Sequence, residues 1–108
     1  MSTTQAAFET IFMEIALHLR HTDNVEKGNM FGAKCLKINK KAFAMYYLGD
    51  MIFKLPLDDP LLDLDGVHPF QPMPERTMNG WVQVPNRHSD RWESLAVRAL
   101  ALLPQRQP

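Results

Sequence analysis

The sequence contains a single cysteine, Cys35, so the chain cannot form an intramolecular disulfide. One cysteine is compatible with a reducing compartment. No stretch approaches the roughly 18 consecutive apolar residues of a membrane-spanning helix. The N-terminal segment also lacks a basic region followed by an uninterrupted apolar run, which is the pattern of a secretory signal. We therefore expect a cytoplasmic protein that does not bind a membrane.

Net charge is absent as well, because 12 lysines and arginines balance 12 aspartates and glutamates. A neutral chain has no bulk attraction to nucleic acid, so such a partner would need a local basic patch. Apolar residues, in contrast, are plentiful: 45% of the chain is hydrophobic and 22% is charged, as in globular proteins. A chain of 108 residues has the size of one domain, and we expect a single domain over residues 1–108.

Near the N-terminus, apolar residues recur every three or four positions, which predicts an amphipathic helix over residues 4–21. The stripe consists of Phe8, Ile11, Phe12, Ile15 and Leu19. Ser2 and Gln5 have the spacing of a capping box at the start of this helix. A second stripe predicts a C-terminal helix that begins with a capping box of Asp90 and Glu93 and ends at Pro104.

Between these helices the apolar period changes to two, which predicts three antiparallel strands joined by tight turns. The predicted strands cover residues 33–38, 42–48 and 51–55, with turns at Asn39–Lys41 and Gly49–Asp50. Strict alternation would place Phe43, Met45 and Tyr47 on the same face of the second strand.

The rest of the chain is less regular. A short helix is predicted between Pro60 and Gly66, and the proline-rich segment 68–77 is expected to be extended or looped. A last strand is predicted over residues 80–84, with its Trp81 packing against Trp92 of the final helix.

This order of elements indicates an α+β fold. We expect a two-layer sandwich in which an antiparallel sheet of about five strands carries the N- and C-terminal helices on one face or along its edges, in the order α-β-β-β-α-β-β-α.

Several segments together resemble the N-terminal domain of the TfoX (Sxy) competence regulators. The resemblance covers most of the chain, from Phe8 to Leu103, and it lies in the order and spacing of the pieces rather than in any single one. The pieces are Met30-Phe31-Gly32, Asn39-Lys40-Lys41-Ala42-Phe43-Ala44, Ile52-Phe53-Lys54-Leu55, Pro69-Phe70, Met78, Trp81-Val82-Gln83-Val84-Pro85, Trp92, Leu95-Ala96 and Ala99-Leu100.

The resemblance implies a small antiparallel sheet with flanking helices, akin to the MmcQ/YjbR proteins. Full-length TfoX proteins regulate DNA-uptake genes and carry a second, C-terminal domain, for which 108 residues leave no room, so the chain is identified as a short standalone member. Lys40 stands where many relatives have glycine in the first hairpin turn. Because lysine tolerates positive φ poorly, we expect a different turn geometry here.

No residue pattern indicates catalysis. Cys35 has no recognisable catalytic motif around it, so we interpret it as a small packing residue. The segment from Gly28 to Gly32 is not a P-loop, because no Lys-Ser/Thr follows and the next element is a strand. We expect a non-enzymatic protein.

Metal and cofactor sites are not indicated either. His18 and His21 could both face a metal from one helix, but the ligand set that a zinc site needs is not present at a recognisable spacing. The run Asp63-Leu64-Asp65-Gly66 is similar to the centre of an EF-hand loop, yet Leu61 and Pro72 then occupy ligand positions. We predict no metal and no cofactor.

Charge is distributed unevenly along the chain. Residues 20–41 carry a net charge of +4 and residues 50–65 a net charge of −4. A basic hairpin could contact phosphates, and opposite poles could pair between two copies of the chain. The candidate interaction surface consists of Met30, Phe31, Lys34, Lys37, Lys40 and Lys41.

Three hypotheses follow. The first is a regulatory domain that acts through a protein partner or through self-association as a homodimer. The second is a nucleic-acid-associated regulator that uses the basic hairpin. The third is a small-molecule binding domain whose site lies between the sheet and the helices.

Overall fold

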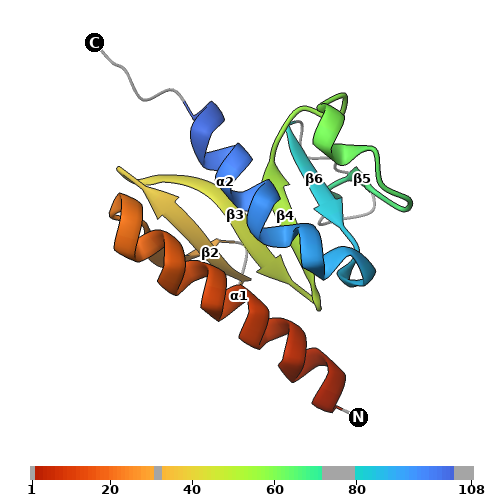
Figure 1. Ribbon diagram of the computed structural model, residues 1–108, viewed down its shortest axis with the longest axis horizontal. Helices are drawn as coiled ribbons and strands as arrows, with labels where there is room; N and C mark the ends of the chain where they lie inside the picture. Colours follow the sequence, from red (N-terminus) through yellow and green to blue (C-terminus); the bar gives the residue numbers. More distant parts are fainter. Residues whose placement is uncertain (1, 31–32, 72–79, 104–108) are drawn as a thin grey trace.

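The computed structural model describes residues 2–30, 33–71 and 80–103, and it describes side chains from residue 7 onward except at 22, 23 and 30. Within these ranges the chain forms a six-stranded antiparallel sheet with the strand order β1-β2-β3-β4-β6-β5. Figure 1 shows both long helices, α1 and α2, on the same side of this sheet. The predicted α+β class and the predicted positions of both helices are therefore confirmed.

The long N-terminal helix α1 (Ser2–Asp23) follows the predicted stripe. Phe12, Ile15 and Leu19 are buried, and Phe8 and Ile11 are partly buried against the same core. Burying one such side chain contributes about 1.5–3 kcal/mol. The helix ends at Asp23, and the next residue, Asn24, has a φ of 58°, the left-handed conformation common after a helix. The predicted cap of Ser2 and Gln5 lies outside the described side chains.

The first strand, β1 (Glu26–Met30), is the element that the sequence analysis missed, and it raises the strand count from about five to six. Its pairing with β2 (Ala33–Ile38) places Gly28 opposite Cys35. A Cβ on Gly28 would lie 2.9 Å from Cε of Lys37, whose side chain occupies that space. A glycine among polar residues gives no period-two signal, so the strand is evident only from its partner.

Two tight turns connect the central strands. Asn39 and Lys40 join β2 to β3 (Lys41–Tyr47) with φ values of 52° and 67°. The expectation of another geometry for Lys40 is therefore wrong. Two positive φ angles give the turn whose twist matches that of the flanking strands, and this match outweighs the local preference of lysine. Leu48 and Gly49 form the next turn with φ values of 51° and 91°, one residue earlier than predicted, and β4 (Asp50–Lys54) begins at Asp50.

Alternation in β3 is broken at one point. Leu36 pairs with Ala44 but Lys37 pairs with Ala42, so Phe43 is an extra residue in a β-bulge. Phe43 and Ala44 consequently both belong to the core under the helices, whereas Met45 packs on the opposite face. The prediction that Phe43 and Met45 share a face is wrong because of this bulge.

The sheet has an apolar cluster on each face. The larger one includes buried residues of α1, α2, β2, β3, β4 and β6, among them Phe12, Phe53 and Trp92. The smaller one contains no residue of either long helix and consists of Cys35, Met45, Ile52, Phe70 and Trp81. Trp81 and Trp92 therefore do not pack together as predicted.

The C-terminal part contains shorter elements than predicted. The 3-10 turn η1 (Pro60–Leu62) replaces the helix expected as far as Gly66. The two-residue strand β5 (His68–Pro69) pairs with β6 (Trp81–Val84), which confirms the last predicted strand. The remainder of the proline-rich segment, residues 72–77, lies outside the described residues.

The final helix, α2 (Trp92–Leu102), is directly preceded by the 3-10 segment η2 (Asn86–Arg91). The predicted capping box of Asp90 and Glu93 is wrong, because Arg91 is the N-cap residue and its side chain makes no capping hydrogen bond. The preceding turn takes over part of this role, since the Trp92 N–H donates to the carbonyl of Ser89.

Candidate interaction surface

The predicted basic residues do not form one patch. Lys34 lies on the helix side of β2 and pairs with Glu9 of α1. Lys37 lies on the opposite side, with its aliphatic chain across Gly28. Lys40 and Lys41 are exposed at the hairpin between β2 and β3. The lysines thus face different directions, and one of them is already paired with a carboxylate.

The two apolar members of the predicted surface are described only in part. Met30 is the last residue of β1, where its backbone pairs with Ala33, and its side chain lies outside the described residues. Phe31 also lies outside them.

The chemistry-bearing side chains are held in structural contacts. Cys35 is 1% exposed, and burial raises the pKa of its thiol, although nearby Lys37 offsets part of that rise. At neutral pH Cys35 is therefore a protonated thiol and a weak nucleophile. Nδ1 of His18 lies 2.7 Å from Oε2 of Glu93, and this contact connects α1 to α2. His88 lies 2.7 Å from the carbonyl oxygen of Asp65.

Among the described residues, no three histidine, cysteine or acidic side chains come together as a metal site. Within the same part of the chain, none of the helices has the length and apolar character needed to cross a membrane.

Asp59 is the buried carboxylate of the described chain, at 6% exposure. It accepts hydrogen bonds from the Leu61 N–H and from Nε of Arg98 on α2, both at 3.0 Å. These contacts fasten η1 to the helix layer, so Asp59 has a structural role.

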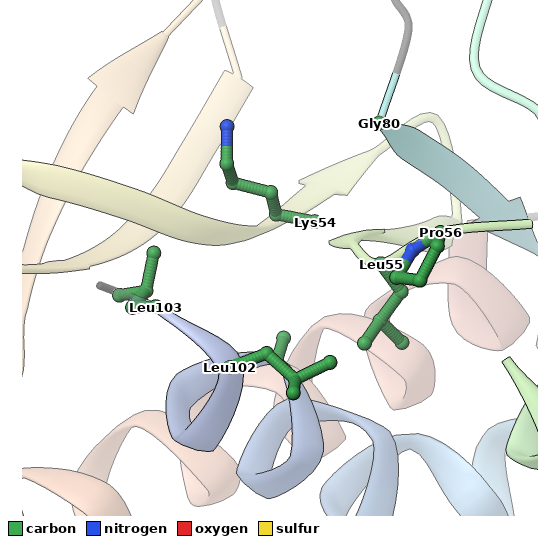
Figure 2. A pocket seen from close by; sticks show the side chains of 7 residues that line it. Lys54, Leu55, Pro56, Gly80, Leu102 and Leu103 are labelled. Atoms are coloured by element: carbon green, nitrogen blue, oxygen red, sulfur yellow. The ribbon is translucent and has the colours of Figure 1, made fainter. Parts of the chain in front are cut away.

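One hollow lies at the C-terminal end of α2. Figure 2 shows Leu102 and Leu103 extending from the helix across from Pro56 and Gly80. Its volume is about 280 Å³ and its one charged lining residue is Lys54, whose ammonium lies 5.5 Å from the centre of the Trp81 ring. A single cation gives little basis for orienting a ligand. In addition, Gly80 and Leu103 each adjoin a segment that the structure does not describe. We assign no ligand to this hollow.

The two edges of the sheet differ in how open they are. At one edge β5 has two residues, and Pro69 has no N–H to offer to another strand. At the other edge β1 has five residues and no proline, and it pairs with β2 alone among the described strands. An edge of this kind presents backbone donors and acceptors to a further chain.

Two hollows adjoin each other along α1, and one of them reaches the open edge. The first, of about 220 Å³, lies between α1 and β1; the second, of about 420 Å³, continues along α1. They share Met13 and Leu17, and Leu17 is 57% exposed. We call their combined lining, together with the β1 edge, the α1–β1 surface. Its residues are Glu9, Thr10, Met13, Glu14, Ala16, Leu17, Arg20 and 25–30.

Charge varies along this surface in a regular way. Glu9 and Glu14 lie toward the N-terminal end of the α1 hollows, whereas Arg20 and Lys27 lie at the other end, with Leu17 between them. Glu14, Arg20 and Lys27 form no ion pair with another described residue. The surface therefore combines an apolar centre with an acidic and a basic end.

Sequence reasoning did not identify this surface. The one clue in the sequence was that Met13 and Leu17 are apolar although they fall outside the buried stripe of α1. Their significance depends on β1, which the periodicity did not reveal.

Comparisons with family models, with curated proteins and with solved structures gave no match.

Proposed function

We propose that this chain acts in the cytoplasm as a non-enzymatic regulatory domain that binds protein through the α1–β1 surface. The observation that carries the proposal is the juxtaposition of an open strand edge, β1, with an exposed apolar hollow on α1. The resemblance to the TfoX N-terminal domain agrees with a regulatory role.

Strand edges and apolar grooves contribute differently to recognition. The free backbone groups of β1 can extend the sheet by hydrogen bonding, which supplies affinity with little dependence on sequence. The side chains of the adjoining hollow, above all Leu17 and Met13, supply an apolar contact of defined shape. A partner that engages both would be selected by its side chains as well as held by its backbone.

Nucleic-acid binding has weaker support. A nucleic-acid backbone is bound by several cations that face its phosphates together. Here Lys34 pairs with Glu9, and Lys37 projects from the other face of the sheet. Lys40 and Lys41 are exposed together at the hairpin tip, which gives two neighbouring cations rather than a row of them.

Affinity capture from the native host with two matched variants tests the proposal. Leu17→Asp places a charge in the centre of the α1–β1 surface, and Val97→Asp places the same charge on α2, where Val97 is 47% exposed. Both positions are at the surface, so both variants should fold. We expect Leu17→Asp to lose the proteins that wild type captures and Val97→Asp to retain them. Equal capture by both variants would contradict the proposal.

A further inference from the structure

We infer that the partner at the α1–β1 surface is a second copy of the chain, related by a two-fold axis that joins the two β1 strands into one continuous sheet. This inference rests on the proposed function, because it uses the same surface. It adds the identity of the partner and the symmetry of the complex.

The charge order along α1 is self-complementary. Glu14, Leu17 and Arg20 follow one another at intervals of three residues, so Glu14 and Arg20 lie about 4.5 Å before and after Leu17 along the helix axis. A two-fold axis beside Leu17 makes the two helices antiparallel and brings Leu17 against Leu17 of the second copy. Glu14 of each copy then lies level with Arg20 of the other, which gives two opposite-charge contacts.

The strand edge admits the same symmetry. An antiparallel pairing centred on Gly28 places Lys27 opposite Asn29 of the second copy, and Glu26 opposite the backbone of Met30. No lysine then faces a lysine across the junction. Gly28 at the centre has no side chain to obstruct the approach of the second strand.

The alternative of head-to-tail pairing between opposite poles has less support. Most acidic residues of 50–65 follow β4, in the stretch that leads directly to β5. The β5 edge has two residues and a proline and so offers few backbone groups. Contact between two different edges is also a head-to-tail contact, which closes only when the rotation between copies completes a ring and otherwise builds an open filament. Two identical β1 edges close after two copies.

Sedimentation equilibrium of the purified full chain tests the inference. We expect wild type to have the mass of two chains at micromolar concentration and Leu17→Asp to have the mass of one. Val97→Asp should remain dimeric. A wild-type chain that is monomeric at the highest soluble concentration would overturn the inference, as would a dimer that Leu17→Asp leaves unchanged.

Charge reversal provides a second test that folding defects cannot imitate. Glu14→Arg makes positions 14 and 20 both basic, and Arg20→Glu makes them both acidic. In a dimer of either variant alone, both contacts between these positions become repulsive. Each variant alone should therefore dimerise about tenfold more weakly. Mixing the two variants should restore association as a heterodimer, and Lys40→Glu should have no effect in the same assay. Mixed variants that stay monomeric while wild type dimerises would show that Glu14 and Arg20 do not meet.

The outcomes separate the two proposals. A monomeric wild-type chain whose captured host proteins still depend on Leu17 overturns self-association and keeps the proposed function. A wild-type dimer that Leu17→Asp dissociates supports both. If Leu17→Asp alters neither the mass nor the capture, both are wrong.

Discussion

The two faces of the sheet are stabilised in different ways. On one face both long helices contribute buried side chains to the larger cluster. On the other face the smaller cluster includes Phe70, which follows the two-residue strand β5, and no residue of a long helix. The difference suggests that the helix layer supplies most of the stability, whereas the opposite face depends on a few large side chains. Four predictions test this comparison, beginning with the largest expected effect.

Truncation of one phenylalanine on each face compares them directly. Phe53 and Phe70 are both 0% exposed. We expect Phe53→Ala to lower the free energy of unfolding by about 4 kcal/mol and Phe70→Ala by about 2–3 kcal/mol, because a short edge strand can relax into the cavity more easily than a central one. Urea unfolding followed by circular dichroism measures both. Equal losses would mean that the two faces are equally rigid.

Asp59 connects η1 to the helix layer, and its removal tests how firmly that layer is attached. Asp59→Ala removes the hydrogen bonds to the Leu61 N–H and to Arg98. We expect a loss of about 1–3 kcal/mol in the free energy of unfolding. Asp58→Ala is the matched control, because Asp58 is exposed. If the two substitutions have the same small effect, the contact with Arg98 is not stabilising.

Trp92 is fully buried on the helix face, yet its indole N–H has no hydrogen-bond partner in the described part of the chain. Trp92→Phe removes that donor together with part of the ring. Because the gain from losing an unpaired N–H opposes the cost of the smaller side chain, we expect a net change of about 1 kcal/mol or less. A loss above about 3 kcal/mol in chemical denaturation would mean that packing alone determines the outcome.

The stability of the protein at alkaline pH tests the burial of Cys35 in the smaller cluster. Burial raises the pKa of Cys35 above 9.0, and burial raises that of Tyr46 above 10.0, with Glu9 and Asp50 adding to the rise. The folded state holds these protons more tightly than the unfolded state does. Their stabilising contribution is therefore complete below pH 9.0 and is lost as the pH rises further.

We expect the free energy of unfolding to decrease as the pH rises above 9.0, and the free energy of unfolding of Cys35→Ala to decrease less over the same range. Thiol labelling with a maleimide at pH 8 should be slow in the folded chain and fast in urea. Rapid labelling of the folded chain would contradict the burial of Cys35 within the smaller cluster.

The candidate site could be predicted less well than the fold. The lysines that the sequence indicated lie on different faces, because a period-two strand sends Lys34 and Lys37 to opposite sides. The hollow on α1 depends on Leu17, which is visible in the sequence, and on its distance from β1, which is not. A surface is defined by the elements that meet there, and periodicity within one element does not report which others are adjacent.

By itself, the sequence determined the features that depend on near neighbours along the chain. These are the buried stripe of α1, the strands on either side of each tight turn, and the absence of an uninterrupted apolar run. The tertiary structure decided the features that arise between distant segments: the strand β1, the bulge at Phe43, the separation of Trp81 from Trp92, and the left-handed turn at Lys40. The physical reason is that strand pairing and burial reward contacts between residues far apart in sequence, and those contacts can override what each residue prefers locally.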